Sequence, residues 1–545
     1  MQLALPLGRS ALFTSLAGVA ASAIGLLWFP WAGWLLAFFS VITLIGIRDV
    51  VQRRRTVSRN YPILIHLRYF LESIGPEIRQ YFIESDTDER PFSREQRALV
   101  YQRSKNVLDK KPFGTQLDVY GNGYEWINHS LRPSTIDGHD FRIEVGSGRA
   151  KPYSASVFNI SAMSFGSLSP NAVLALNAGA ARGGFFHDTG EGSISRYHRQ
   201  HGGDLVWEIG SGYFGCRNPD GTFNEERFIE NARLDQVRMI EIKLSQGAKP
   251  GAGGMLPGAK VNAEIAEARG VPQGRDVMSP ASHSAFSTPI EFLLFIDRLR
   301  TLSGGKPVGF KLAIGHPWEW FGLVKAMLET GIHPDFIVVD GAEGGTGAAP
   351  LEFLNRVGVP LREGLMLVHN TLVGAGLRDS IRIGAAGKIT SAFMMARTMA
   401  MGADWCNAAR AFMFALGCIQ AKSCHNDRCP SGVATQNPAR WRNLDVEIKA
   451  QRVHMFHQNT LQGLAQLISA AGLNHPQEIG PEHIIRRISD CEVKSYEALF
   501  PFLRPGQLLD GTPEHSLFRR FWSLSRPDSF NPPDSIAALR QTKLR

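Results

Sequence analysis

Cysteine is scarce in this chain. Only 6 cysteines occur in 545 residues, and three of them, Cys216, Cys406 and Cys491, are scattered without the spacing of a disulfide framework. A small secreted protein held together by disulfides is therefore excluded, and the soluble part of the chain is expected in a reducing compartment.

A strong charge of one sign is also missing. The formal net charge is +9, from 59 basic and 50 acidic residues, and part of it comes from the short basic run at residues 53–55. Such charges usually form a solvated surface, so no nucleic-acid partner is expected. Internal repeats and low-complexity tracts are absent, while a hydrophobic share of 44% with 55 glycines is typical of a globular protein with many tight turns.

The other three cysteines, Cys418, Cys424 and Cys429, lie close together and are followed by Pro430. Thiolates at such short spacing suit an iron-sulfur cluster or zinc. Three ligands favour a cluster with three thiolate attachments, because structural zinc needs a fourth ligand, which His425 could supply. The alternative is a set of buried free cysteines.

Two uncharged apolar runs, residues 11–28 and 31–47, open the chain and are separated by Pro30. Each is about long enough to cross a membrane as a helix, so residues 1–50 are predicted to form a transmembrane helical hairpin. Positive charges flank the pair at Arg9, Arg48, Arg53, Arg54 and Arg55. They predict both ends, and the domain that follows, on the cytoplasmic side of the inner membrane. A cleaved signal peptide or a buried helical hairpin are the alternatives.

After about residue 141, short β-branched or aromatic runs end in glycine-rich turns and alternate with helical patterns. The predicted strands are residues 158–162, 205–209, 239–244, 309–314, 336–340, 381–384 and 404–408, and predicted helices include residues 172–182, 289–302, 320–330 and 391–401. This alternation predicts an α/β fold, a (β/α)8 TIM barrel over residues 141–440. Residues 51–140 are interpreted as a membrane-proximal helical and linker region, and residues 441–545 as a helical extension.

Active sites of such barrels form from loops at the C-terminal ends of the strands. The turn at residues 383–389, with Gly387 and Lys388, follows a strand and opens a helix, where backbone N–H groups can bind a phosphate. Asn407 and Arg410 end the next strand and could complete the site, which favours a flavin phosphate near the cysteines. A simple packing turn is the alternative.

Lysines mark two other strand ends. Lys311 could offset negative charge on the N1/O2 side of a reduced flavin, or could pair with a structural carboxylate such as Asp340. Lys243 and Lys249, with Arg269 downstream, suit an anionic substrate unless they are simply solvated. Glycine-dense loops at residues 161–167, 188–192 and 340–350 allow close approach of backbone to a ligand.

Residues 210–215 fit the pattern G-x-G-x-x-G, but Cys216 and Pro219 follow where a helix should begin. A dinucleotide site is therefore rejected. We expect that the electrons do not come from a nicotinamide bound in this chain.

Over about residues 150–440 these segments resemble the flavin- and iron-sulfur-containing synthase domain of glutamate synthases, and in particular the stand-alone, membrane-anchored FMN-binding glutamate synthase family. The motifs that carry the resemblance lie at residues 161–167, 189–192, 246–250, 256–258, 344–350 and 417–436. The resemblance implies FMN in the barrel, a [3Fe-4S] cluster on Cys418, Cys424 and Cys429, and 2-oxoglutarate over the flavin.

The resemblance also assigns roles to single residues. Lys243, Lys249 and Arg269 would hold the keto acid, and Glu191 would sit near it. The residues expected to line the flavin are Ser161, Ala162, Met163, Ser164, Gln246, Lys311, Gly344, Gly345, Thr346, Gly384, Gly387, Lys388, Asn407 and Arg410.

Ala252 and Met255 stand where glutamate synthases have a carboxylate and a glutamine, so the keto acid is expected to differ. The chain begins with the hairpin and not with an amidotransferase domain, so its nitrogen would come from ammonia or an amine. We expect a membrane-tethered oxidoreductase that reductively aminates a 2-oxo acid, with electrons from a ferredoxin or a partner subunit. The alternatives are a flavin-dependent dehydrogenase of another small acid, and a non-catalytic redox-sensing membrane protein.

Overall fold

The computed structural model describes residues 9–52, 56–85, 87, 90–511 and 515–537. The chain divides into two compact units, Met1–Glu89 and Arg90–Arg545. Arg53, Arg54 and Arg55, on which the predicted membrane orientation partly depends, lie outside the described residues.

The first unit begins with two apolar helices, α1 (Ser10–Gly25) and α2 (Ala32–Val51), packed against each other. Small side chains allow the close approach: a Cβ at Gly18 would come 2.6 Å from the Phe39 ring. Thr43 Oγ1 donates to Ser15 Oγ across the interface at 3.0 Å. Among the described helices α2 is the one that is long and apolar enough to cross a membrane, while α1 has 16 residues and is shorter than the expected run.

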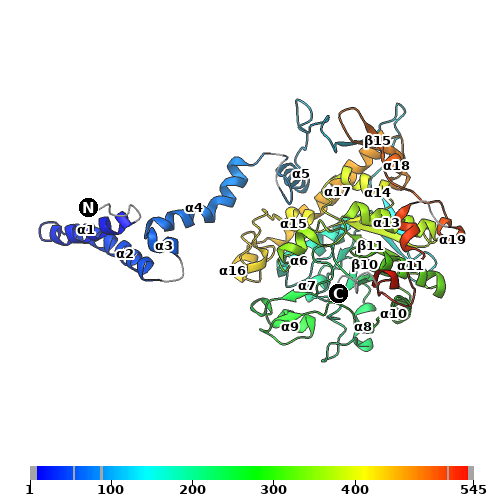
Figure 1. The fold of residues 1–545 in the computed structure, drawn as a ribbon, viewed down its shortest axis with the longest axis horizontal. Helices are drawn as coiled ribbons and strands as arrows, with labels where there is room; N and C mark the ends of the chain where they lie inside the picture. Colours follow the sequence, from blue (N-terminus) through cyan, green and yellow to red (C-terminus); the bar gives the residue numbers. More distant parts are fainter. Residues whose placement is uncertain (1–8, 53–55, 86, 88–89, 512–514, 538–545) are drawn as a thin grey trace. The chain divides into compact units, whose positions relative to one another are not determined.

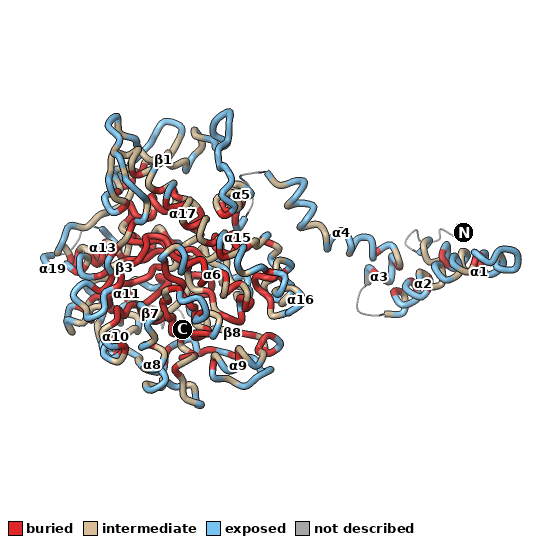
Figure 2. The backbone as a smooth tube through the Cα atoms, turned by 180° about the vertical axis from the view of Figure 1, so that it is seen from behind, coloured by how far each residue is buried: buried red, intermediate tan, exposed pale blue. Residues whose placement is uncertain are grey.

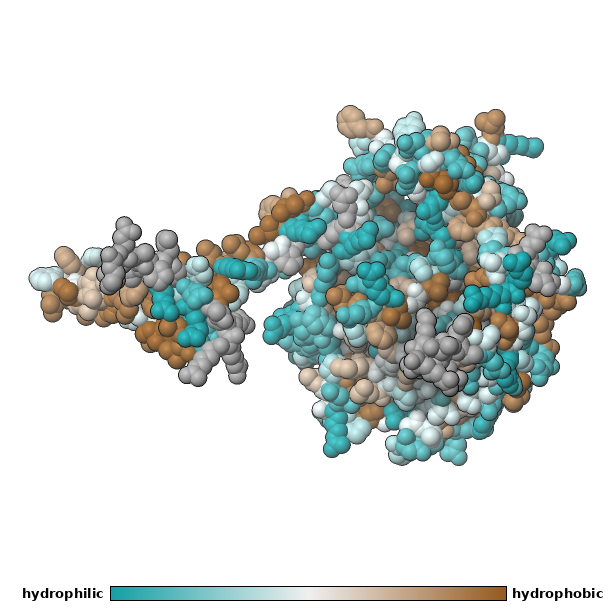
Figure 3. Space-filling view, viewed as in Figure 1, coloured by the Kyte–Doolittle hydropathy of each residue, from teal (hydrophilic) through white to brown (hydrophobic). Residues whose placement is uncertain are grey.

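The first unit continues with α3 (Thr56–Asn60), α4 (Leu64–Ile78) and the short π-helix η2 (Arg79–Ile83). Figure 3 shows hydrophobic side chains on the surface of this unit. Many of them are exposed, including Trp28, Trp31 and Trp34 at the turn between α1 and α2.

A closed barrel of eight parallel strands forms the centre of the second unit. Its strands are β4 (Phe158–Ile160), β5 (His187–Asp188), β6 (Leu205–Ile209), β7 (Val237–Lys243), β10 (Val308–Leu312), β11 (Phe336–Asp340), β12 (Arg382–Ala386) and β13 (Trp405–Ala408). The barrel closes where β13 pairs with β4, with Ala408 opposite Ile160. The predicted (β/α)8 fold is confirmed. Buried on both faces, these strands have the apolar sequences typical of parallel sheets.

Helices surround the barrel, as Figure 1 shows, and Figure 2 shows the buried backbone concentrated inside this layer. Local signals define several helix ends: Ser169 and Thr288 cap α6 (Pro170–Gly183) and α10 (Pro289–Leu302), each with proline in the first turn. The other helices along the barrel are α8 (Glu225–Ala232), α9 (Ala263–Arg269), α11 (Pro317–Thr330), α12 (Leu351–Arg356), α13 (Leu361–Gly374), α14 (Ala392–Ala400) and α15 (Arg410–Leu416).

Residues 90–140 contribute a helix and a strand to the second unit. Helix α5 (Arg94–Ser104) packs on α15 and on the long α17 (Val446–Ala470), and it buries Val100. Strand β1 (Glu125–Ile127) pairs with β14 (Ile484–Arg487), which pairs with β15 (Val493–Ser495). The C-terminal extension is thus mainly helical, but it carries two strands that complete a sheet with a segment from before the barrel.

Candidate active site

The loops after the barrel strands pack tightly on one another at the C-terminal end of the barrel. A Cβ at Gly190, after β5, would come 2.6 Å from the backbone nitrogen of Ser164, after β4. A Cβ at Gly247, after β7, would come 1.8 Å from the carbonyl oxygen of Gly341, after β11. Glycine is therefore required at both positions for steric reasons. The glycine-rich loops form one continuous layer over the barrel.

Four side chains in this layer form a charged cluster. Lys243 ends β7, and its ammonium lies 2.6 Å from a carboxylate oxygen of Glu191, which follows β5. Lys249 donates to the carbonyl of Gly253 at 2.6 Å, and Arg269, the last residue of α9, donates to the carbonyl of Phe165 at 3.2 Å. The sequence placed these four residues on three separate segments, and the structure brings them together.

The electrostatics of the cluster are dominated by the three cations. Burial alone would raise the pKa of Glu191, but Lys243, with Arg269 and Lys249, outweighs burial and holds the pKa below its ordinary value. Burial lowers the pKa of Arg269 to about 10 and also lowers the pKa of Lys249. Three cations and one carboxylate leave the cluster with a net charge of +2 when all four are ionised, which suits a dianion.

The buried side chain of Arg269 has a hydrogen-bond donor that is not used. Its side chain is buried with 5% exposure, its guanidinium carbon lies 5.1 Å from the centre of the Phe214 ring, and its Nε has no hydrogen-bond acceptor among the described residues. A buried donor without an acceptor is costly unless a ligand or water supplies one. Arg269 can therefore donate a further hydrogen bond, and its positive charge favours an anionic ligand as the acceptor.

A second charged cluster lies inside the barrel. Lys311 on β10 pairs with Glu208 on β6 and lies 3.4 Å from Glu241 on β7. Asp340 accepts a hydrogen bond from Gly247 N and makes no direct ion pair with Lys311 within the described part of the chain. The structural pairing that the sequence left open for Lys311 is therefore present, but with these glutamates. Whether Lys311 also faces a flavin stays a prediction.

Burial governs the titration of this interior cluster. Burial, then repulsion from Glu208, raises the pKa of Asp188 to about 7. Burial, then repulsion from Asp188, raises the pKa of Glu241 well above its ordinary value. Burial alone would lower the pKa of Lys311, but its carboxylate neighbours raise it. Asp188 and Glu241 are therefore harder to ionise than exposed carboxyl groups.

The residues expected at the flavin phosphate lie after β12 and β13. Lys388 has a left-handed backbone (φ 54°), is half-buried, and makes no ion pair within the described residues; burial lowers its pKa. Arg410 begins α15 and donates to the carbonyl of Gly345, which links the loops after β13 and β11. Asn407 is buried, and its Oδ1 has no donor among the described residues. These groups leave two cations and one acceptor available to a ligand.

Other predicted flavin residues have structural contacts. A Cβ at Gly384 would come 2.5 Å from the Trp405 ring, so Gly384 is explained by packing within the sheet. Ser164 Oγ lies 3.1 Å from Ser167 Oγ, and Gln246 Oε1 lies 3.5 Å from the Lys243 ammonium. The remaining ones, Ser161, Ala162, Met163, Gly344, Thr346 and Gly387, lie in the loops after β4, β11 and β12.

The loop that holds Cys418, Cys424 and Cys429, here called the cysteine loop, follows α15 and packs on loops that follow other barrel strands. Lys260 donates to the carbonyl of Cys424 at 3.0 Å, and a Cβ at Gly347 would come 3.0 Å from the backbone nitrogen of His425. Burial raises the pKa of the Cys418 thiol to about 11, and the nearby Cys424 and Cys429 add to the rise. The cysteine loop thus lies against the loops after β7 and β11, where a bound redox group would be a neighbour of the charged cluster.

The cysteine loop has a strained backbone. Three non-glycine residues between the first and last cysteine adopt the left-handed conformation: Gln420, Lys422 and Asp427, with φ of 58°, 56° and 62°. Such a concentration of unfavourable backbone conformations is typical of functional sites. Alternation of right- and left-handed residues also turns successive N–H groups to one side, an arrangement found around iron-sulfur clusters.

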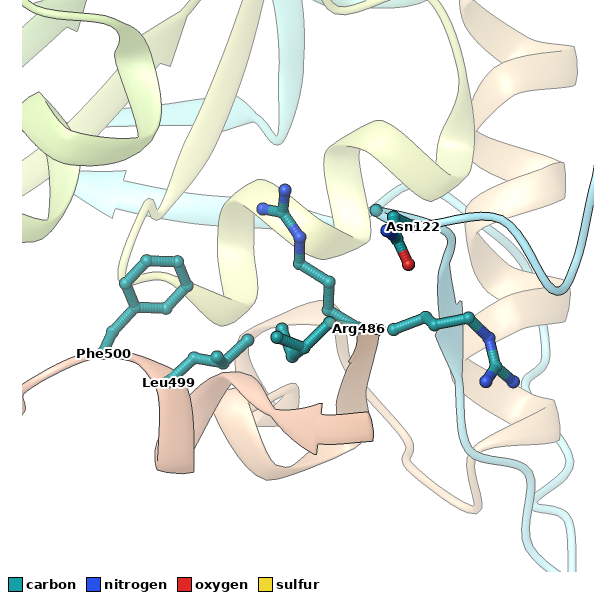
Figure 4. Close-up of a pocket in the computed structure, with 7 residues that line it drawn as sticks. Asn122, Arg486, Leu499 and Phe500 are labelled. Carbon is teal, nitrogen blue, oxygen red and sulfur yellow. The ribbon is translucent and has the colours of Figure 1, made fainter. Parts of the chain in front are cut away.

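Residues 210–215 follow β6 and border the charged cluster: the Phe214 ring centre lies 5.1 Å from the guanidinium carbon of Arg269, and a Cβ at Gly210 would come 2.8 Å from a carboxylate oxygen of Glu191. The next helix along the chain is α8. A cavity of about 340 Å³ is lined by Asn122, Gly123, Arg486, Arg487, Ile488, Leu499 and Phe500. Figure 4 shows Arg486 between Asn122 on one side and Leu499 and Phe500 on the other. None of these residues belongs to a loop that follows a barrel strand.

A closed parallel barrel with a cationic cluster and glycine-rich loops at the C-terminal ends of its strands defines a (β/α)8-barrel enzyme site. The comparison with known families agrees: residues 138–474 match the conserved region in glutamate synthase. The chain therefore belongs to the glutamate synthase family, a family of oxidoreductases, and the expected family is confirmed.

Two relatives that are similar in sequence support the assignment. The glutamate synthase large subunit-like protein YerD of Bacillus subtilis strain 168 is 37% identical over 497 residues, which cover 84% of this chain and 94% of that protein. The archaeal glutamate synthase (NADPH) of Methanocaldococcus jannaschii is 35% identical over 316 residues, which cover 58% of this chain and 59% of that protein. A flavocytochrome b2 mutant with pyruvate bound resembles the chain with a TM-score of 0.42 and 11% identity, covering 83% of this chain and 91% of that one.

Proposed function

We propose that this protein is an FMN and iron-sulfur oxidoreductase that reductively aminates a 2-oxo dicarboxylic acid such as 2-oxoglutarate. The observation that carries the proposal is the net charge of +2 in the cluster of Lys243, Lys249, Arg269 and Glu191, which complements the two carboxylates of such an acid. Preorganised charge in a buried site contributes more than the same charge in water.

The residues present fit FMN. Lys388 and Arg410, together with the N-terminus of α14, offer positive charge for a phosphate at the usual station of such barrels. Asn407, with its free buried oxygen, offers an acceptor for a ring N–H or a hydroxyl. The glycine-rich loops admit a flat ring system close to the backbone.

The cysteine loop fits a polynuclear cluster better than a single zinc ion. Among the described residues, three metal-ligating atoms come within 4.8 Å of one another in the group Asp188, Glu208 and Glu241 but not in the cysteine loop, so at least one pair of the three cysteine sulfurs is farther apart than 4.8 Å. Tetrahedral zinc with bonds of ~2.3 Å requires sulfurs about 3.8 Å apart. Wider spacing suits thiolates on different iron atoms, as in the proposed [3Fe-4S] cluster on Cys418, Cys424 and Cys429.

When bound, FMN would supply hydride to the imine formed from the 2-oxo acid and ammonia, and the cluster would pass it electrons from an external donor. The side chains of the charged cluster bind and orient the 2-oxo acid. Lys243, Lys249 and Arg269 neutralise the two carboxylates, and Glu191 holds the Lys243 ammonium in place. A ferredoxin or a partner subunit is the proposed electron donor, because residues 210–215, which fit the dinucleotide pattern in sequence, are not followed directly by a helix.

We also propose that the helical hairpin of residues 11–47 anchors the protein in the cytoplasmic membrane, with the barrel on the cytoplasmic side. The apolar α2 and its interface of small residues with α1 support this. Flotation of the full chain with lipid vesicles after an alkaline wash tests it. Release of the chain into the wash would contradict the anchoring.

An anaerobic titration tests the reaction. Chemically reduced protein is mixed with 2-oxoglutarate and ammonium, and the flavin absorbance is followed. Reoxidation that requires both compounds supports reductive amination. No reoxidation with 2-oxo acids, but reduction of the oxidised protein by a hydroxy or amino acid, would favour the alternative of a dehydrogenase that passes electrons outward. Bound flavin without turnover of any acid would favour a redox sensor.

A further inference from the structure

Helix α4 and the adjoining η2 carry an exposed apolar face. The large hydrophobic side chains on residues 64–83 that are exposed are Leu64, Leu67, Phe70, Leu71, Ile78, Tyr81, Phe82 and Ile83, with exposures from 37% to 84%. Leu64, Leu67, Leu71 and Ile78 follow helical spacing and share one face, and Arg68, Glu72 and Arg79 lie along one edge of that face. Figure 2 shows α4 exposed along most of its length.

The contacts of α4 within its own unit leave this face uncovered. Asp49 near the end of α2 is buried; it accepts a hydrogen bond from Ile63 N at 3.1 Å and lies 2.9 Å from His66 Nε2. Ile65 is buried as well, with 3% exposure. Asp49 therefore ties the start of α4 to the end of α2 through one side of the helix. The apolar side, which begins at Leu64 and Leu67, remains outside this contact.

An exposed apolar stripe of this length marks an interaction surface. A second copy of the chain would need an apolar heptad pattern sustained over about three or four heptads to form a coiled coil. Here the sequence Gly75-Pro76 and the π-helical turn Arg79–Ile83 interrupt the pattern. A lipid surface tolerates such a break, because it requires only a continuous apolar face and no defined register.

The composition of the stripe also suits a membrane interface. Aromatic rings at Phe70, Tyr81 and Phe82 are typical of the headgroup level. Arginines along the edge of the stripe, such as Arg68 and Arg79, are typical of helices that lie on anionic lipid. The stripe begins 13 residues after α2, the helix that can cross a membrane, and is tied to its end by Asp49.

We propose that residues 64–83 lie in the plane of the membrane interface, with the exposed apolar stripe inserted among the lipid chains. This rests on the proposed membrane anchoring by α1 and α2. The segment is then a lipid-binding element of the first unit that is separate from the hairpin.

The experiment uses the full chain reconstituted in vesicles of phosphatidylethanolamine and phosphatidylglycerol. A dansyl-bearing amino acid is placed at position 67, 71 or 78 of the stripe. The matched controls are positions 68, 72 and 79, each the next residue in the chain and about 100° further around the helix. Quenching is measured with a nitroxide-bearing lipid in the vesicles and, separately, with iodide in the water.

We expect lipid quenching at least about two-fold stronger at the stripe position of each pair, and iodide quenching weaker there by a similar factor, because neighbours on a helix differ by about 100° in direction. Equal iodide quenching within each pair would mean that the stripe faces water and would overturn the proposal. Protection of the stripe from iodide without lipid quenching, lost when each vesicle holds at most one copy, would instead identify a contact between copies.

The outcomes are separable from those of the proposed anchoring. Flotation after the alkaline wash reports on the hairpin, whereas the paired quenching reports on residues 64–83. A chain that floats but shows no difference within the pairs refutes the interfacial helix alone. A chain that does not float refutes the anchoring on which it rests.

Discussion

Replacing Arg269 by methionine should change the preference of the enzyme between acids with two carboxylates and acids with one. Methionine keeps much of the buried side-chain volume but removes one of the three cations, so the charge of the cluster falls from +2 to +1. A dicarboxylate such as 2-oxoglutarate then keeps one carboxylate without a full partner. Pyruvate, with a single carboxylate, still finds two lysines.

The size of the effect follows from the lost contact. A hydrogen bond to a charged group contributes about 1.5–3 kcal/mol, which corresponds to a factor of roughly 10–150 in kcat/KM. We expect a loss in this range for 2-oxoglutarate with ammonium and a clearly smaller loss for pyruvate. The assay is anaerobic reoxidation of the reduced flavin by each acid at a fixed ammonium concentration.

Arg300 provides the matched control. It is also buried, with 8% exposure, but it pairs with Asp335 and Asp297 away from the strand-end loops. Arg300→Met should lower the melting temperature and leave the ratio of kcat/KM values for the two acids unchanged. If Arg269→Met lowers kcat/KM by the same factor for both acids, the assignment of Arg269 to a substrate carboxylate is refuted.

Three further outcomes are expected. Cys424→Ser should remove the brown absorbance of the purified protein, and unchanged iron and sulfide contents would contradict the cluster assignment. Lys311→Met leaves Glu208 buried without its cation and should lower the free energy of unfolding by about 3–5 kcal/mol in denaturant titrations. A second change, Glu208→Gln, should restore part of this loss. An unaltered unfolding midpoint would show that the pair does not stabilise the barrel. The pKa of Asp188 is raised to about 7 from 3.8, so its stabilising effect is complete below pH 3.8 and is lost as the pH rises through 7; the stability of Asp188→Asn relative to the natural protein should therefore rise between these pH values, and a constant difference would argue against the shift.

Most of the barrel could be predicted because parallel strands buried on both faces have a strong apolar signal. The range 205–209 was predicted with the bounds of β6, and 336–340 with those of β11. Strand β5 was missed, since it contains only His187 and Asp188 and two residues show no periodicity. Its place follows only from closure of the barrel between β4 and β6.

The interior carboxylates were missed for a different reason. Glu208 and Glu241 lie directly opposite each other on β6 and β7, and like charges in such positions are destabilising without a cation nearby. Lys311, two positions beyond the partner of Glu241, supplies that cation. Single acidic residues within apolar strands were the available signal, but their pairing depends on strand register. Segments whose partners are distant in sequence, such as β1 with β14, were hidden in the same way.

The structure shows where Ala252 and Met255, the two residues that depart from the glutamate synthase pattern, lie relative to the charged cluster. Their loop closes over the charged cluster: Gly253 accepts a hydrogen bond from Lys249, and a Cβ at Gly254 would come 2.8 Å from a carboxylate oxygen of Glu191. Met255 is 48% exposed, whereas the backbone nitrogen of Ala252 donates to the carbonyl of Lys249 within the turn itself. A carboxylate at position 252, as the family resemblance implies for glutamate synthases, would lower the net positive charge beside Lys249. Alanine at this position adds no negative charge, so the positive charge of the cluster is not reduced. Under the proposed function, the cluster would then select a dianion by charge more than by directional hydrogen bonds, and charge alone discriminates less sharply among related 2-oxo dicarboxylates.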